Sequence, residues 1–161
     1  MGAVVVIGVI LAVLFGAVYF SKRRFGLLGL ALAAGAMLSS LWTAELTPLV
    51  EQVGVDLVAP PLETVVAATL TLLPALLLLG TGPKASGTLP RVLASVSFVL
   101  LALALLLGPI GAGFVITGQA LVTYNFLEEY RFAIVTAALV YALYDIITYK
   151  PPKLDGKKSK H

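Results

Sequence analysis

The chain has 161 residues, of which 60% are hydrophobic and only 12% are charged, and its formal net charge is +3. Soluble domains carry about 45–50% apolar and about 25% charged residues, so one water-soluble core of this length could not hide so much apolar surface. The charges lie in short clusters between long apolar runs, which predicts an all-α, multi-pass transmembrane protein. Because there is no cysteine, disulfides, thiolate chemistry and cysteine-based metal sites are excluded.

The excess of basic residues does not indicate a nucleic-acid partner, because these residues are not interleaved with aromatic residues on a soluble face. A topology signal and a basic tail near anionic lipid headgroups explain them better. We therefore expect the partners to be membrane lipids, other membrane proteins or further copies of this chain.

The first two predicted spans flank a short basic joint, Ser21-Lys22-Arg23-Arg24-Phe25. Residues 3–20 are apolar and would extend about 27 Å as a helix, close to the thickness of the hydrocarbon core of a membrane. No basic region precedes them, so we expect a retained first helix rather than a cleaved signal peptide. The second span is predicted over residues 26–43.

Small residues recur every four positions in the second predicted span, at Ala31, Gly35 and Ser39. Residues with this spacing share one face of a helix, and their small side chains let another helix backbone approach closely. The sequence therefore predicts a helix-packing face along these three positions.

Residues 44–63 contain four acidic residues, three prolines and no basic residue. Thr47-Pro48 is typical of an N-cap followed by a proline in the first helical turn. The following leucines and valines fall on one helical face, but the segment is too short and too acidic to cross a bilayer. We expect a short helix that lies at the membrane–water interface on the outer, non-cytoplasmic side.

Residues 64–79 form the third predicted span, in which Pro74 should produce a kink because it lacks a backbone donor. Residues 92–107 form the fourth, which Gly108-Pro109 then breaks or bends. Residues 110–124 are apolar but short for a separate crossing, so a kinked continuation, a re-entrant hairpin and a second interfacial helix all fit. We favour a broken helix that folds back near the surface.

Residues 132–149 form the last predicted span, and residues 150–161 form a basic tail that we expect to be disordered. Asp145 is the ionisable residue that lies within an apolar span, and Tyr141 shares its helical face. Intramembrane charges often mark functional sites. Asp145 is therefore either an intramembrane polar site or a structural anchor that pairs with lysines of the tail.

The distribution of basic residues predicts the orientation of the chain. If the basic joint is cytoplasmic and each of five spans crosses once, ten of the eleven lysines and arginines face the cytoplasm and only Arg131 lies outside. The N-terminus is then outside and the C-terminus cytoplasmic, with Lys22, Arg23 and Arg24 as topology anchors. A sixth crossing by residues 110–124 would place the joint and the tail on opposite sides.

The sequence predicts no catalytic, cofactor-binding or metal-binding residues. His161 is the only histidine, so neither a Ser-His-acid triad nor a multi-histidine metal site can be assembled. Asn125, Glu128, Glu129 and Arg131 cluster just before the last predicted span. Either they form a solvated helix start, in which acids suit the helix dipole, or they contact a ligand or partner on the outer face. We do not expect an enzyme.

Turns, helices and a Pro/Leu-rich segment follow one another in a characteristic order over the first two-thirds of the chain. The basic turn Ser21-Lys22-Arg23-Arg24-Phe25-Gly26-Leu27-Leu28-Gly29 leads into a Gly-rich second helix through Gly35, and an outer Pro/Leu segment runs from Leu46 to Pro61. A third helix and a polar turn with Leu89-Pro90-Arg91 come before the fourth. In this order, the first two-thirds of the chain resembles the colicin V production protein family. That resemblance implies a multi-pass protein of the bacterial inner membrane, linked to envelope maintenance and export of a peptide toxin, without established enzymatic chemistry.

Two functions are consistent with the sequence. The first is a non-enzymatic integral membrane protein that acts through helix–helix contacts as an accessory or assembly subunit, because the chain offers packing faces and few buried polar groups. The second is a small oligomeric channel or transporter subunit, because Pro74, Gly108-Pro109 and Asp145 are features of substrate pathways.

Overall fold

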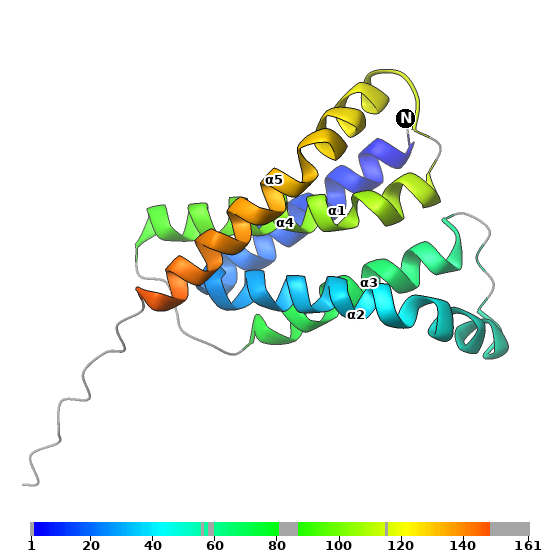
Figure 1. Ribbon diagram of the computed structural model, residues 1–161, viewed down its shortest axis with the longest axis horizontal. Helices are drawn as coiled ribbons and strands as arrows, with labels where there is room; N and C mark the ends of the chain where they lie inside the picture. Colours follow the sequence, from blue (N-terminus) through cyan, green and yellow to red (C-terminus); the bar gives the residue numbers. More distant parts are fainter. Residues whose placement is uncertain (1, 56, 58–59, 81–86, 115, 149–161) are drawn as a thin grey trace, which may run out of the picture.

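The computed structural model is all-helical, as the sequence predicts, over the residues that it describes (Figure 1). It describes residues 2–55, 57, 60–80, 87–114 and 116–148. The helices are α1 (Gly2–Ser21), α2 (Phe25–Gln52), α3 (Leu62–Leu78), α4 (Thr88–Gly113) and α5 (Gln119–Ile147). They run alternately back and forth along one long axis. The basic joint, the end of α3, the start of α4 and the end of α5 therefore lie together, at what we call the joint end; the opposite end is the far end.

Three of these helices, α2, α4 and α5, are long and apolar enough to cross a membrane. The helix α3, with 17 residues, and the part of α1 over Ile7–Ser21 are shorter apolar helices. At a rise of about 1.5 Å per residue, α3 extends about 26 Å, slightly less than a hydrocarbon core of about 30 Å. The predicted tail over residues 150–161 lies outside the described residues.

The expected interfacial helix after the second span is wrong, because α2 continues through Thr47-Pro48 to Gln52. The hydroxyl of Thr47 donates backward to the Thr43 carbonyl at 2.8 Å, whereas an N-cap would accept from an amide further along the chain. The side chain therefore supports the preceding turn of the helix. Pro48 removes a single backbone donor one turn before the helix ends, and the helix tolerates that loss.

The expected break at Gly108-Pro109 is also wrong, because α4 runs through both residues to Gly113. In apolar surroundings a broken helix would leave several backbone groups without partners, whereas a proline inside a continuous helix removes only one bond. The expected fold-back over residues 110–124 is instead the last turn of α4, a short connection and the first turns of α5. As a result, α5 begins at Gln119 rather than near residue 132.

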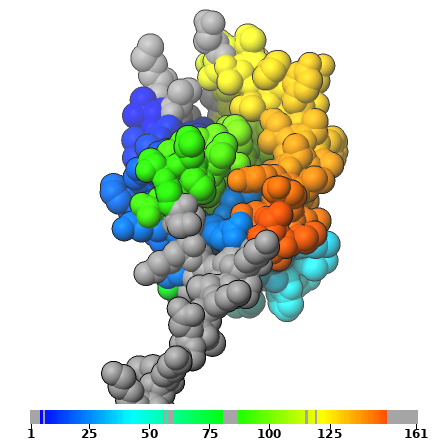
Figure 2. All heavy atoms as spheres, turned by 90° about the vertical axis from the view of Figure 1, so that its left-hand side faces the viewer, coloured from blue at the N-terminus to red at the C-terminus, as the bar shows by residue number. Residues whose placement is uncertain are grey.

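The buried core lies toward the joint end, where all five helices meet. Its residues are Leu14 and Val18 of α1, Phe25, Leu28, Ala31 and Leu32 of α2, Ala75 of α3, Ala94, Phe98, Leu101 and Ala102 of α4, and Ala138 and Ala142 of α5. Figure 2 views the molecule from the joint end, with blue atoms of the first two helices between green α4 and orange α5. Toward the far end, α2 and α3 stay together while α1, α4 and α5 diverge from them (Figure 1).

Candidate functional site

The basic joint is a tight turn between α1 and α2. Lys22 adopts a left-handed backbone conformation with φ of 55°, which is uncommon for a residue with a side chain. The Ser21 hydroxyl donates to the Val18 carbonyl at 2.8 Å at the end of α1. This geometry leaves the Lys22 side chain exposed and directs the two following arginines to different neighbours.

Arg23 contacts the carboxyl end of α3. Its Nε donates to the Leu79 carbonyl at 3.1 Å, and its Nη2 donates to the Gly80 carbonyl at 2.6 Å. The last carbonyls of a helix have no partners within the helix and carry the negative end of its dipole. A guanidinium at this position therefore satisfies two acceptors and places a positive charge where the dipole favours one.

Arg24 pairs with Asp145, near the end of α5. Arg24 Nε donates to Asp145 Oδ1 at 3.0 Å, and the Gly26 backbone amide donates to Asp145 Oδ2 at 2.9 Å. Because the first amides of a helix also lack partners within the helix, this carboxylate acts as a cap for α2 that comes from α5. The Asp145 side chain is 14% exposed and that of Arg24 is 24% exposed, so the pair lies at the edge of the packed bundle.

Tyr141 packs one helical turn from Asp145. Its ring stacks on Phe25 with a centroid distance of 5.3 Å and an interplanar angle of 18°. Glycine is required opposite these side chains, because a Cβ on Gly26 would lie 2.7 Å from the Ala142 carbonyl oxygen. The predicted polar pair Asp145 and Tyr141 therefore holds the start of α2 against the end of α5. Within the described residues the ion-pair partner of Asp145 is Arg24, and the tail lysines that we considered as partners lie outside those residues.

The small residues of α2 face α3. A Cβ on Gly35 would lie 2.2 Å from the Thr71 carbonyl oxygen and 2.9 Å from that of Leu70, so only glycine fits this contact. Leu70 is four residues before Pro74, and its carbonyl therefore lacks the amide partner that a helix normally supplies. The close approach of Gly35 brings its Cα–H group, which is a weak hydrogen-bond donor, near this carbonyl oxygen. The backbone of α2 thus packs directly on the part of α3 that precedes Pro74.

Ser39 and Ala31 extend this contact along the same face. The Ser39 hydroxyl donates to the Ala67 carbonyl of α3 at 3.1 Å, and Ala31 is buried in the core. All three small residues are therefore buried inside the chain, and Gly35 and Ser39 join α2 to α3.

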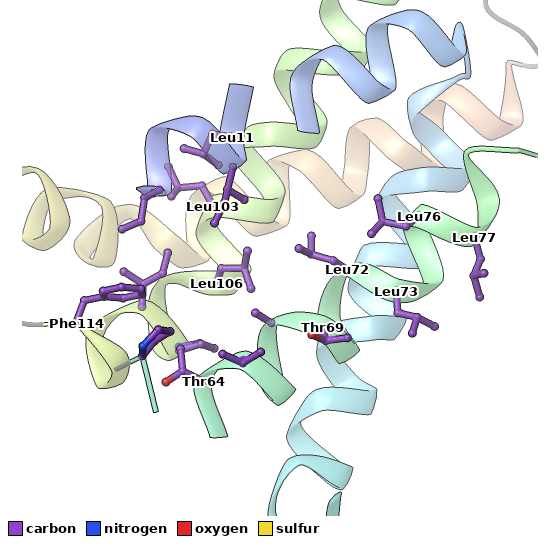
Figure 3. Close-up of a pocket in the computed structure, with 17 residues that line it drawn as sticks. Leu11, Thr64, Thr69, Leu72, Leu73, Leu76, Leu77, Leu103, Leu106 and Phe114 are labelled. Atoms are coloured by element: carbon purple, nitrogen blue, oxygen red, sulfur yellow. The ribbon is translucent and has the colours of Figure 1, made fainter. Parts of the chain in front are cut away.

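An apolar groove with a volume of about 520 Å³ lies between α1, α3 and α4. Figure 3 shows leucines of α3 and α4 and the ring of Phe114 around it. Thr64 and Thr69 are the only lining residues with a polar side-chain group. On α3 the lining residues Thr64, Ala68, Leu72 and Leu76 recur every four positions, so one face of this helix forms a wall along nearly its whole length.

The polar cluster that we expected at the start of the last span lies in the middle turns of α5. Arg131 pairs with Glu128 at 3.3 Å, and both side chains are substantially exposed. Asn125 and Glu129 are exposed as well. Among the described residues, no group of three or more histidine, aspartate or glutamate side chains could hold a metal ion. The cluster therefore lies on an exposed surface of α5.

Two features of this site were not predicted from the sequence. The capping role of Arg23 and the Arg24–Asp145 pair involve residues far apart in the chain, and their only signal is the opposite charges at the ends of apolar runs. The groove has no local signal, because its lining is made of ordinary apolar residues from three helices. Comparisons with protein-family models, curated proteins and solved structures found no match to this chain.

Proposed function

We propose that this chain is a non-enzymatic integral membrane protein that acts through helix–helix contacts in the plane of the membrane, as an accessory or assembly subunit. The observation that carries this proposal is the poor burial of α5. In an apolar 18-residue stretch of α5 only 11% of the residues are buried, compared with 44% in the corresponding stretches of α2 and α4. A helix that is long and apolar enough to span, yet packs so little on its own chain, offers a face to a neighbour.

The exposed face of α5 is continuous along the helix. Phe132, Thr136, Val140 and Tyr144 recur every four residues, and all four are exposed. By contrast, the small face of α2, which first indicated helix packing, is occupied by α3 and is not available to a partner. The proposal therefore rests on α5, and a second copy of this chain or another membrane protein would pack there.

The proposed arrangement in the membrane has five crossings, an outer N-terminus and a cytoplasmic C-terminus. The back-and-forth order of the helices supports it, because α1 precedes and α3 connects longer helices that satisfy the length of a span. Charge supports the same arrangement, since Lys22, Arg23, Arg24 and Arg91 lie at the joint end. The resemblance to the colicin V production family favours a role in the bacterial inner membrane, in envelope maintenance or toxin export.

A small channel or transporter subunit is the weaker alternative. The features that motivated it have other roles, because Gly108-Pro109 lies within continuous α4 and Asp145 is engaged by Arg24 and the Gly26 amide. The groove contains no charged lining residue that would attract an ion.

Cross-linking tests the proposal directly, because the chain contains no cysteine and a single introduced thiol has no background. Val140→Cys on α5 should form a dimer or a hetero-complex in native membranes when treated with a thiol-specific cross-linker. The matched control is Val13→Cys on α1, since these two valines have similar exposure, 61% and 64%. Equal cross-linking of the two variants, or monomers only, would contradict a contact through α5.

A further inference from the structure

The groove between α1, α3 and α4 is not explained by a contact through α5. Its α3 wall runs from Thr64 to Leu76, which at about 1.5 Å per residue is about 18 Å. Along this length its volume of about 520 Å³ is lined almost wholly by apolar side chains, as the binding of a hydrocarbon chain requires.

The length of the groove points to one leaflet of a membrane. Half of a hydrocarbon core is about 15 Å deep, so an acyl chain that enters from one surface would follow most of this wall. The lining suits such a chain, because it is apolar except for two threonines and contains no charged group. Outer residues of α1, such as Ile7 and Leu11, and Leu106 of α4 close the opposite wall.

The charge of the bundle selects the end at which a headgroup would lie. At the joint end the described charged residues are Lys22, Arg23, Arg24, Arg91 and Asp145, and in the far half they are Glu45, Glu51, Glu63, Glu128, Glu129 and Arg131. Arg23 binds the carbonyls of Leu79 and Gly80, within one helical turn of Leu76 at the end of the groove. Lys22 is adjacent to it and exposed. The basic end of the groove is thus complementary to an anionic headgroup.

We propose that this groove binds one acyl chain of an anionic phospholipid, with its headgroup at the joint end beside Lys22 and Arg23. The apolar wall of α3 holds the chain, and the basic joint provides the preference for negative charge. This assignment does not depend on which partner packs on α5.

The test uses the full chain extracted from vesicles of phosphatidylcholine and phosphatidylglycerol, with bound lipid measured by native mass spectrometry. The wild type should retain one phosphatidylglycerol. Ala68→Phe places a ring in the groove and should abolish retention, whereas Ala137→Phe, on the exposed surface of α5, should leave it unchanged. Equal retention by both variants, or retention of a second copy of the chain in place of lipid, would overturn the proposal.

A second variant tests the headgroup separately and does not alter the packing of the helices. Lys22→Asn removes the charge but suits the left-handed backbone, since asparagine adopts this conformation more readily than most residues. The preference for phosphatidylglycerol over phosphatidylcholine should fall about fivefold, the effect of one basic residue near an anionic surface. The control, Arg131→Gln in the far half, should keep the wild-type preference. An unchanged preference in Lys22→Asn would refute the assignment of the headgroup.

Discussion

At the joint end, all five helices contribute to one buried core, and charged side chains cap the helix ends above it. Toward the far end, α1 and α4 move away from α3, and their apolar side chains line a groove that runs along α3 from Thr64 to Leu76. The same types of residue, mostly leucine, valine and alanine, occur in both regions. In this chain, the helices therefore pack tightly at the end where charged side chains cap them and form an ion pair. Where such contacts are missing, apolar faces of the helices remain open to another molecule.

The largest effect is expected for a matched pair of phenylalanine truncations. Phe98 is fully buried in the core, so Phe98→Ala should leave a cavity and lower the free energy of unfolding by about 3 kcal/mol. Phe126, toward the far end, is 59% exposed, and Phe126→Ala should change it by less than about 0.5 kcal/mol. Unfolding measured in detergent compares the two. Similar losses would show that the two regions are equally well packed.

A pair of glycine substitutions should have the next largest effect. Gly35→Ala pushes a methyl group against the backbone of α3 and should cost about 2 kcal/mol, because a backbone cannot rotate away. Gly8→Ala, in the outer half of α1, meets no atom within 4 Å and should cost nothing. Thermal unfolding in detergent measures both changes. A stable Gly35→Ala variant would mean that α2 and α3 are further apart than the structure places them.

The ion pair at the joint end should be worth more than the one in the middle of α5. Asp145→Asn leaves Arg24 without its carboxylate and weakens the cap of α2, so it should cost about 1–2 kcal/mol, less than a fully buried pair. Glu128→Gln removes an exposed partner of Arg131 and should cost less than about 0.5 kcal/mol. A double-mutant cycle between Arg24 and Asp145 measures the coupling, and a coupling near zero would contradict the anchor role.

The smallest effect is expected where α4 and α5 meet at the far end. The Tyr124 hydroxyl donates to the Leu107 carbonyl at 3.2 Å, and its ring lies over Gly111, whose added Cβ would be 2.2 Å from the hydroxyl oxygen. Tyr124→Phe should cost about 0.6 kcal/mol, a typical value for a hydrogen bond between membrane helices. Unfolding in detergent provides the measurement. A loss as large as that of Asp145→Asn would mean that the far end is also held by polar contacts.

The helical class could be predicted from the sequence because apolar periodicity and long uncharged runs are local properties. The two errors, at Thr47-Pro48 and Gly108-Pro109, both came from interpreting proline and glycine as the end of a helix. Near the end of α2, Thr47 bonds to the preceding turn and Pro48 removes a single backbone donor, so the helix continues. Within the apolar helix α4, a break would leave backbone groups without solvent partners, so this helix continues as well.

The candidate site was only partly predictable for a different reason. The residues Asp145, Tyr141, Arg23 and Arg24 stand out in the sequence because charged and polar groups are rare there. Their partners depend on how the helix ends meet, which no local pattern encodes. The groove depends on the angle at which α1 and α4 diverge from α3. Apolar residues such as Leu72 and Leu106 would look the same in the sequence whatever that angle is.

The Asp145 cap also has a consequence for biosynthesis. Its carboxylate is 121 residues from Arg24 and 119 from the Gly26 amide along the chain. Chains are synthesised from the N-terminus, so α2 emerges and inserts long before its cap exists. Until α5 is in place, the start of α2 lacks this cap and Arg24 lacks its carboxylate. The joint is therefore closed only when the last helix has been added.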